Sequence, residues 1–236
     1  MDYDIINKAR RLLVSSLDKY SGDKPIKIKI DKYILKEILF LNIGYYVFIT
    51  NLEDVYCKID WSDIPMDRVR VIGKDLSKYR NIKINPQTVH NKDLSNTICK
   101  GVEFVGLFDD ANIVRTNFAG SIDAIINPQT VRSKDLSYGI FKDVIFTDTF
   151  DGACIIGANF DGSNKGLIDV SRVYQRRLSN ANLGSTILSG SFYGCDTSNT
   201  TFVNAIYEGQ LIEDDKTFKT SIYRKVRAKN KQNMMP

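Results

Sequence analysis

The sequence repeats itself with a period of 42 residues, and this repeat limits the possible folds more than any other feature. The phrase INPQTV begins at residue 84 and again at residue 126, followed by HNKDLS in the first copy and RSKDLS in the second. A third, diverged copy begins with IDVSRV at residue 168. The aligned copies cover residues 84–118, 126–160 and 168–202. A fixed period of about 20–50 residues is typical of repeat proteins, in which each copy packs against its neighbours.

Within each copy the large apolar residues recur every five residues, and one step at the same place is shortened to four. Sixteen of these residues form the predicted core: Leu94, Phe104, Phe108, Ile113, Phe118, Leu136, Phe141, Phe146, Phe150, Ile155, Phe160, Leu178, Leu183, Leu188, Phe192 and Phe202. Cys99 occupies the same kind of position, and Thr197 is the one polar exception. A step of five rotates an α-helix by about 140° and changes the face of a straight strand, so neither keeps one side apolar. A chain that turns a corner every five residues points each large residue inward.

The position two residues before each large residue is small or β-branched in most cases, which predicts a second inward position with little space. The first such position of every copy is instead basic, with Lys92, Lys134 and Arg176. We expect this position to mark a corner that opens to solvent, beside the INPQTV segment.

A step back by one full period from the first copy reveals a diverged leading copy. It has Leu52, Cys57, Met66, Val71 and Leu76 at the large apolar positions. The repeat array is therefore expected to run from residue 48 to residue 212.

Short runs in the array resemble the five-residue units of the pentapeptide-repeat family. The runs ANIVR, TNFAG, ANFDG, ANLGS and TTFVN are similar to the family pattern A(D/N)LXX, most clearly within 94–118, 136–160 and 178–202. The resemblance implies an all-β solenoid: a right-handed quadrilateral parallel β-helix of about eight coils, with four five-residue sides per coil. The 42-residue copies are then two-coil repeats.

Two ideal coils, each with four five-residue sides, are two residues shorter than one copy of the repeat. The four-residue step shortens the copy by one more, and the stretch from Phe118 to Leu136 is longer than three sides by three. These two departures together account for the period. INPQTV lies in the lengthened stretch. We therefore expect each two-coil unit to carry the same bulge there, with Pro86 and Pro128 where a ladder N–H is not needed.

Both ends of the array are expected to carry caps, because an open end exposes core and unpaired backbone. Residues 1–47 predict a small α/β cap, with an amphipathic helix over 5–20, a strand over 26–30 and a second helix over 31–42. An alternative use of the first helix is a partner-binding or membrane-surface helix. Its basic residues would be Lys8, Arg10 and Arg11.

Residues 213–236 predict a short cap followed by a basic tail. The tail is either solvated or a weak contact for nucleic acid or another polyanion. Its basic residues are Arg224, Lys225, Arg227, Lys229 and Lys231.

Composition argues against most kinds of catalytic or metal site. Four cysteines are scattered without CxxC pairing, and His90 is the only histidine, so no metal ligand set or cofactor site is expected. The pairs Asp109/Asp110 and Asp148/Asp151 could flank a groove, yet aspartate is common at exposed turn positions of such repeats. We therefore expect a protein that is not an enzyme. No transmembrane segment or secretory signal is recognised, which favours the cytoplasm.

The leading hypothesis is a non-enzymatic scaffold or protein-interaction rod with an unknown protein partner. The alternative, drawn from the family resemblance, is a DNA-mimicking modulator of a type II topoisomerase such as gyrase. That role needs a markedly acidic face, whereas residues 48–212 carry 17 basic and 19 acidic side chains. The resemblance also allows end-to-end homodimerisation. Frequent use of Ile, Lys, Asn and Asp is compatible with a low-GC bacterium or its phage.

Overall fold

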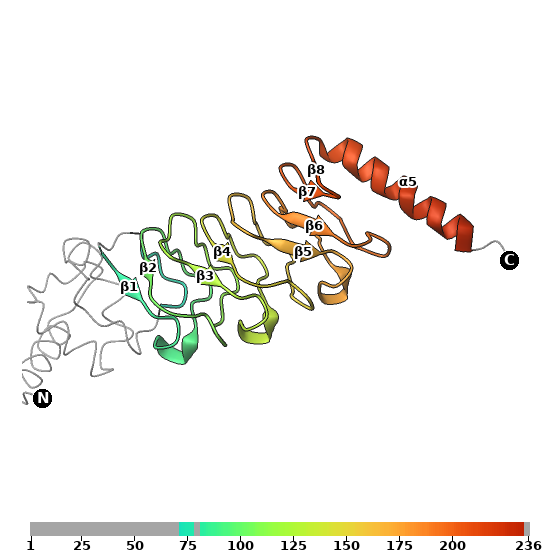
Figure 1. The fold of residues 1–236 in the computed structure, drawn as a ribbon. Helices are drawn as coiled ribbons and strands as arrows, with labels where there is room; N and C mark the ends of the chain where they lie inside the picture. The colour runs from blue at the N-terminus through green and yellow to red at the C-terminus, as the bar shows by residue number, and fades with distance from the viewer. Residues whose placement is uncertain (1–70, 78–80, 234–236) are drawn as a thin grey trace, which may run out of the picture.

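The protein is described here by a computed structural model that covers residues 71–77 and 81–233 (Figure 1). This part is an elongated body of short parallel strands, with one long helix at its C-terminal end. Nothing in it tests the cap predicted for 1–47 or the positions Leu52, Cys57 and Met66, which lie outside the described residues. The elements are β1 (Lys83–Ile84), η1 (His90–Lys92), β2 (Glu103–Phe104), β3 (Ile125–Ile126), η2 (Arg132–Lys134), β4 (Ile145–Phe146), β5 (Leu167–Asp169), η3 (Tyr174–Arg176), β6 (Ile187–Ser189), β7 (Ile206–Tyr207), β8 (Gln210–Leu211) and α5 (Asp215–Asn233).

The chain repeatedly returns to pair with itself in the parallel direction. Asn117 forms parallel bridges with Ile98 before it and Ile140 after it, and the second partner is farther along the chain than the first. Asn159 likewise bridges Ile140 and the more distant Asn182. We call the segment between two such pairings a pass of the chain, so short and long passes alternate. One short pass and one long pass, from Ile98 to Ile140, together make one period of the sequence.

The long pass gains its extra residues at 122–124, immediately before the repeated phrase. Ile122 pairs with Glu103 of the preceding pass, whereas Ile125 pairs with Ile145 of the following pass. The chain thus advances by three residues, from 122 to 125, between two pairings that would otherwise share one position. The expectation that the phrase itself is the bulge is therefore wrong by a few residues.

The phrase forms the end of a strand and the turn that follows it. In the second copy β3 ends at Ile126, residues 128–130 form a turn, and η2 follows. Ile126 and Val131 both face the interior, five residues apart, so the phrase keeps the five-residue spacing of the inward residues. Pro128 lies beyond the end of the strand, where the ladder does not require an N–H donor.

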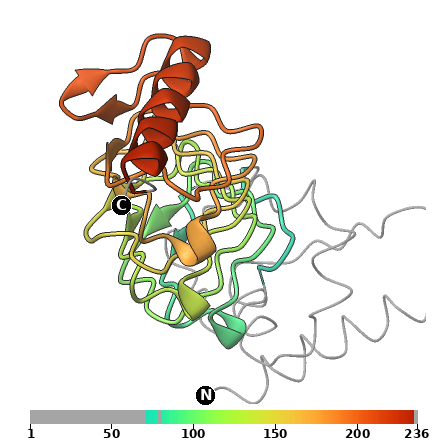
Figure 2. The same ribbon diagram turned by 90° about the vertical axis from the view of Figure 1, so that its right-hand side faces the viewer.

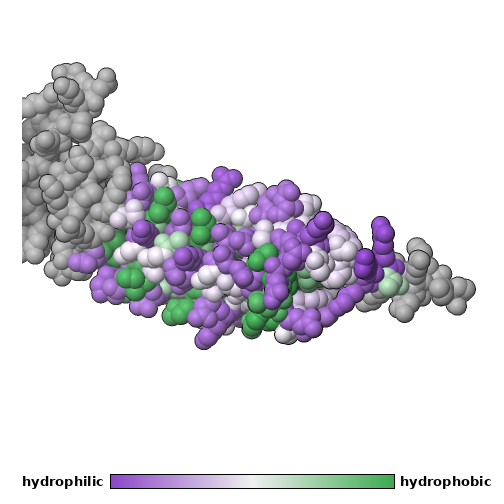
Figure 3. Space-filling model, turned by 90° about the horizontal axis from the view of Figure 1, so that it is seen from above, coloured by the Kyte–Doolittle hydropathy of each residue, from purple (hydrophilic) through white to green (hydrophobic). Residues whose placement is uncertain are grey.

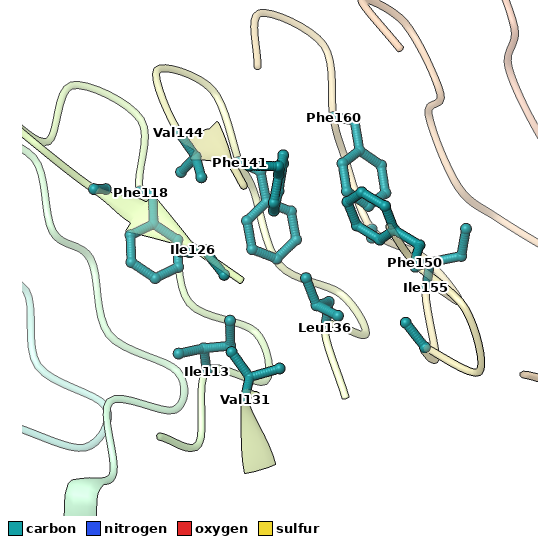
Figure 4. Close-up of a cluster of buried hydrophobic side chains, with 14 of the residues drawn as sticks. Ile113, Phe118, Ile126, Val131, Leu136, Phe141, Val144, Phe150, Ile155 and Phe160 are labelled. Atoms are coloured by element: carbon teal, nitrogen blue, oxygen red, sulfur yellow. The ribbon is translucent and has the colours of Figure 1, made fainter. Parts of the chain in front are cut away.

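All sixteen residues of the predicted core are buried, as are Cys99 and Thr197. Figure 4 shows side chains from successive passes filling the interior one behind another. The rings of Phe118 and Phe141 lie 5.8 Å apart and those of Phe141 and Phe160 lie 5.3 Å apart, both nearly parallel. Burying one such ring contributes about 1.5–3 kcal/mol, so the row of aromatic rings supplies much of the cohesion between passes.

The second inward position holds small side chains, and its threonines are satisfied by hydrogen bonds. The hydroxyls of Thr97, Thr116 and Thr200 donate to backbone carbonyls 22–26 residues earlier, at 2.7–2.8 Å. Buried hydroxyls are tolerated when they have such partners. These bonds also join one pass to the next.

The C-terminal segment differs from the expected short cap and tail. β8 turns back on β7 as an antiparallel pair, and α5 then continues without a break for 19 residues (Figure 2). Residues 215–233 contain neither glycine nor proline, and Asp214 satisfies the first turn, so nothing in the segment ends the helix early. The predicted basic residues therefore belong to an ordered helix.

Candidate interaction surfaces

The three short helices η1, η2 and η3 lie in a row along one edge of the body (Figures 1 and 2). The basic residue of each copy ends its helix in the left-handed region, with φ of 50° at Lys92, 51° at Lys134 and 54° at Arg176. Lys92 and Lys134 are partly exposed and Arg176 is exposed. The basic positions thus lie at an edge that is open to solvent, which we call the η edge.

Glutamines of the repeated phrase join neighbouring passes beside the η edge. The amide Nε2 of Gln87 donates to the carbonyls of Leu107 and Asp109, at 3.0 and 2.6 Å. Gln129 makes the equivalent bonds to Thr149 and Asp151, at 2.7 and 3.1 Å. Each glutamine holds the stretch around the four-residue step of the next pass.

In the third copy a different side chain donates to the carbonyl at the equivalent position. Ser171 replaces the glutamine there, and the guanidinium of Arg176 donates to the carbonyl of Tyr193 at 2.9 Å. Tyr193 corresponds to Asp109 and Asp151 of the earlier copies. Sequence reasoning missed this role of the basic position, because the two partners lie far apart along the chain, on different passes.

Two of the carboxylates considered as catalytic candidates, Asp110 and Asp151, are paired with basic groups. Asp110 lies 3.4 Å from the guanidinium of Arg132 and 4.0 Å from the ammonium of Lys92. Asp151 lies 2.7 Å from Arg172. These ion pairs neutralise the charges of Asp110 and Asp151, which are held by different basic residues.

Asp109 and Asp148, the other members of those pairs, are also surface residues of turns. Asp109 is partly exposed, and its carbonyl accepts the amide of Gln87. Asp148 is exposed; its carboxylate accepts the backbone N–H of Thr149 at 2.7 Å and the amide of Asn127 at 3.4 Å. These contacts are those of turn-forming aspartates.

Aliphatic side chains occupy an outward position of the strands in two in-register runs, which together we call the aliphatic ladder. The first run is Ile125 and Ile145, and the second is Leu167, Ile187, Ile206 and Leu211. Ile145 is partly exposed, and the others are 37% to 58% exposed. In Figure 3 hydrophobic surface forms separate groups, several of them along the lower edge of the view, with hydrophilic surface between them.

In the first two strands, β1 and β2, the ladder position holds charged residues in place of aliphatic ones. Lys83 and Glu103 pair in register there and form a salt bridge of 2.9 Å. The ladder position is therefore charged in β1 and β2 and aliphatic from β3 to β8. Sequence analysis missed the ladder, although its signal was visible as a large aliphatic residue directly before one inward residue of each pass.

Helix α5 covers the last pass of the chain by replacing the hydrogen bonds of a missing next pass. The carboxylate of Asp215 accepts the backbone N–H of Phe202 at 2.7 Å. The ammonium of Lys219 donates to the carbonyl of Thr200. At equivalent places earlier in the chain, the backbone of the following pass fills both roles, as where Phe160 donates to Asn182.

Side chains of α5 also complete the core at this end. The ring of Phe218 lies 5.1 Å from that of Phe202 and 5.6 Å from those of Phe192 and Tyr207. Ile222 is buried beside them. The hydroxyls of Thr197 and Tyr223 are 3.4 Å apart, which explains why the polar exception of the repeat falls in the last copy.

A pocket of about 490 Å³ lies between the β7–β8 pair and α5. Its walls include Tyr207, Leu211 and Phe218. Glu208 and Lys225 also line the pocket and form an ion pair, with 2.7 Å between the carboxylate oxygen and the ammonium nitrogen. The hydrogen bond with Lys225 lowers the pKa of Glu208, and Glu208 in turn raises the pKa of Lys225. The pair fastens the hairpin to the helix at the exposed surface.

The basic residues named from the sequence are carried by α5 in different ways. Arg224 and Arg227 are exposed, Lys225 is bound to Glu208, and Lys229 and Lys231 belong to the last part of the helix. Lys216 adds a further exposed basic residue near the start. We call Lys216, Arg224 and Arg227 the basic face of α5.

The described cysteines are free thiols, and burial raises the pKa of each. Cys99 is fully buried, and burial raises its pKa far above the usual range. Burial also raises the pKa of the Cys195 thiol to about 11. Within residues 71–77 and 81–233, no group of histidine, cysteine or acidic side chains is arranged to hold a metal ion. No helix in that part of the chain has the length and apolar character needed to cross a membrane.

Comparisons with known proteins do not place the chain in a family. No family model matches the sequence, and no curated protein was found to be similar to it.

Proposed function

We propose that the repeat array is a right-handed quadrilateral β-helix of the pentapeptide-repeat kind. The inward residues of each pass, the alternation of short and long passes and the parallel register all support this architecture. The small residues two positions earlier, such as Ala111 and Ala153, are buried as a second inward position requires. The handedness rests on the resemblance to the family.

We further propose that this rod is a non-enzymatic scaffold that binds a protein partner. The aliphatic ladder is the observation that carries the proposal, because a line of exposed aliphatic side chains along a rigid face is typical of a binding surface. A partner that presents a complementary extended apolar strip would bury Leu167, Ile187 and Ile206 together. The polar end at Lys83 and Glu103 would then set the orientation of the partner on the rod.

The charges do not favour the alternative of a DNA-mimicking topoisomerase modulator. Such a protein needs a continuous acidic face, whereas Asp110 and Asp151 on the η edge are paired with arginine or lysine. The scaffold hypothesis therefore ranks first.

The proposal is tested by placing charges on the ladder. The double variant Leu167→Glu/Ile187→Glu puts two carboxylates in the centre of the strip, whereas Thr147→Glu/Ser189→Glu adds the same charge at exposed positions beside it. The full chain and both variants serve as bait in extracts of the native host, and each captured protein is purified and its affinity measured. A protein that binds the full chain and the control variant, but not the ladder variant, supports the proposal.

Equal binding by both variants would show that the ladder is not the binding surface. Self-association is distinguished by measuring the mass of each protein in solution by light scattering. A dimer that is lost only in Leu167→Glu/Ile187→Glu would identify a second copy as the occupant of the ladder.

A further inference from the structure

We propose that the basic face of α5 binds the phosphate backbone of nucleic acid. The inference does not depend on the scaffold function, since α5 lies at the end of the body and the ladder lies along its strands (Figure 1). It rests on the charge of the helix, on the way the helix is held, and on which of its side chains remain available.

The charge of α5 is strongly positive. The helix contains one acidic residue, Asp215, at its first position. Its seven basic residues are Lys216, Lys219, Arg224, Lys225, Arg227, Lys229 and Lys231. The net charge of the helix is therefore +6, whereas the array that precedes it is close to neutral. At about 1.5 Å per residue, the positions from 216 to 231 span about 22 Å, which suits a linear array of anions better than one carboxylate.

The helix is fixed to the body through its opposite side. Asp215, Phe218, Lys219 and Ile222 contact the last pass, and Val226 is partly buried farther along the same stripe. The basic face is consequently presented as a rigid surface and loses little conformational freedom on binding.

Arg224 and Arg227 remain available for a ligand. Both are exposed, and neither forms an ion pair with any residue that the structure describes. They are three residues apart on the helix, so they lie on the same side of it. Guanidinium groups are usual donors to phosphate oxygens.

The same arrangement argues against a membrane surface as the ligand. A helix that lies on a bilayer inserts an apolar face between the head groups. The apolar residues Phe218 and Ile222 are used against the body instead. Binding to a bilayer would then depend only on the electrostatic attraction between the basic face and anionic lipids.

The test measures binding of the full chain to labelled nucleic acids by fluorescence anisotropy, from 50 to 300 mM KCl. The probes are a 20-base-pair DNA duplex, the corresponding single-stranded DNA and an RNA of the same sequence, and they distinguish the source of the phosphates. We expect micromolar binding near 100 mM salt, with an affinity that falls steeply as salt rises. The variant Arg224→Gln/Arg227→Gln should weaken binding at least about tenfold and reduce the slope of log K against log salt by about 2.

A matched control removes the same charge elsewhere. Lys142→Gln/Lys165→Gln lowers the net charge by two at exposed residues of the array and should change the affinity less than twofold. Circular dichroism of each variant checks that α5 remains helical. Binding that is absent at 100 mM KCl, or that both double variants weaken equally, would overturn the proposal. Binding to phosphatidylserine vesicles, with no binding to any of the nucleic acids, would assign the basic face to a membrane surface and would also overturn it.

Discussion

Gln87 and Gln129 are the polar side chains that most directly join one pass to the next. Each donates from one amide to two carbonyls of the following pass, at 2.6–3.1 Å. The ammonium of Lys134 donates a hydrogen bond to the side-chain oxygen Oε1 of Gln129 at 2.6 Å, which holds that side chain in place. The repeated phrase therefore forms a turn and also joins neighbouring passes by hydrogen bonds.

Replacing Gln129 by alanine should lower the free energy of unfolding by about 1–3 kcal/mol. The reason is that the two hydrogen bonds to backbone carbonyls are lost, each contributing about 0.5–1.5 kcal/mol, together with the bond from Lys134. Urea denaturation followed by circular dichroism measures the change. Gln175→Ala is the control, because the amide of that exposed residue reaches only the neighbouring Tyr174 hydroxyl. An equal loss in both variants would mean that the contacts with Thr149 and Asp151 do not stabilise the fold.

Phe141 lies at the centre of the aromatic row and is fully buried. Phe141→Ala should cost about 3–5 kcal/mol of unfolding free energy, since the space left between Phe118 and Phe160 cannot close completely. Phe141→Leu should cost clearly less, because leucine occupies the same position of the third copy, at Leu183. Thermal and urea unfolding measure both variants. A leucine variant as unstable as the alanine variant would argue against interchangeable inward positions.

At the scale of elements, α5 depends on its first turn as much as on its packing. The carboxylate of Asp214 accepts the backbone N–H of Thr217 at 2.7 Å, in the manner of an N-cap. The hydrogen bonds from Thr217 lower the pKa of Asp214 below its usual value. A carboxylate with a lowered pKa in the folded state stabilises that state above its unfolded pKa, and the contribution is lost as pH falls through the folded pKa.

The helix should therefore weaken in acid, as pH falls below the usual pKa of an aspartate and through the lowered pKa of Asp214 in the folded state. Asp214→Ala should lower the helix content at pH 7, whereas Asp214→Asn should keep most of the cap and remove its pH dependence. Circular dichroism at 222 nm between pH 2 and pH 7 follows the helix. If the asparagine variant loses helix in acid in the same way as the unchanged chain, the titration belongs to other carboxylates.

At the scale of the whole molecule, α5 closes an end that the repeat alone would leave open. Without it the backbone groups of Phe202 and Thr200 would lose the partners that Asp215 and Lys219 supply, and Phe192 and Phe202 would lose the cover of Phe218. Open ends of this kind pair with other chains.

A chain that stops after residue 212 should therefore self-associate or precipitate. Removing only residues 234–236 is the control and should leave the mass in solution unchanged. Light scattering after size-exclusion chromatography measures both. The full-length variant Phe218→Asp should show an intermediate tendency, because it disturbs the aromatic contacts and keeps the hydrogen bonds. A soluble monomer that ends at residue 212 would show that the end needs no cover.

The inward residues, the second small position and the repeat period could all be predicted from the sequence. They depend on side-chain volume and spacing along the chain, which are local properties. The alternation of short and long passes agrees with the shortened and lengthened stretches of the sequence for the same reason. The exact place of the extra residues, 122–124, required the register between neighbouring passes.

Contacts between passes were decided only by the tertiary structure. The amide of Gln129 meets carbonyls 20 and 22 residues later, and Arg176 replaces it in the third copy by reaching Tyr193. The C-terminal segment resembled a solvated basic tail because its stabilising partners, Phe202 and Thr200, lie on another pass. Local spacing thus determines which side chains enter the core, whereas register determines which distant polar groups meet and which aliphatic and basic side chains are left on the surface.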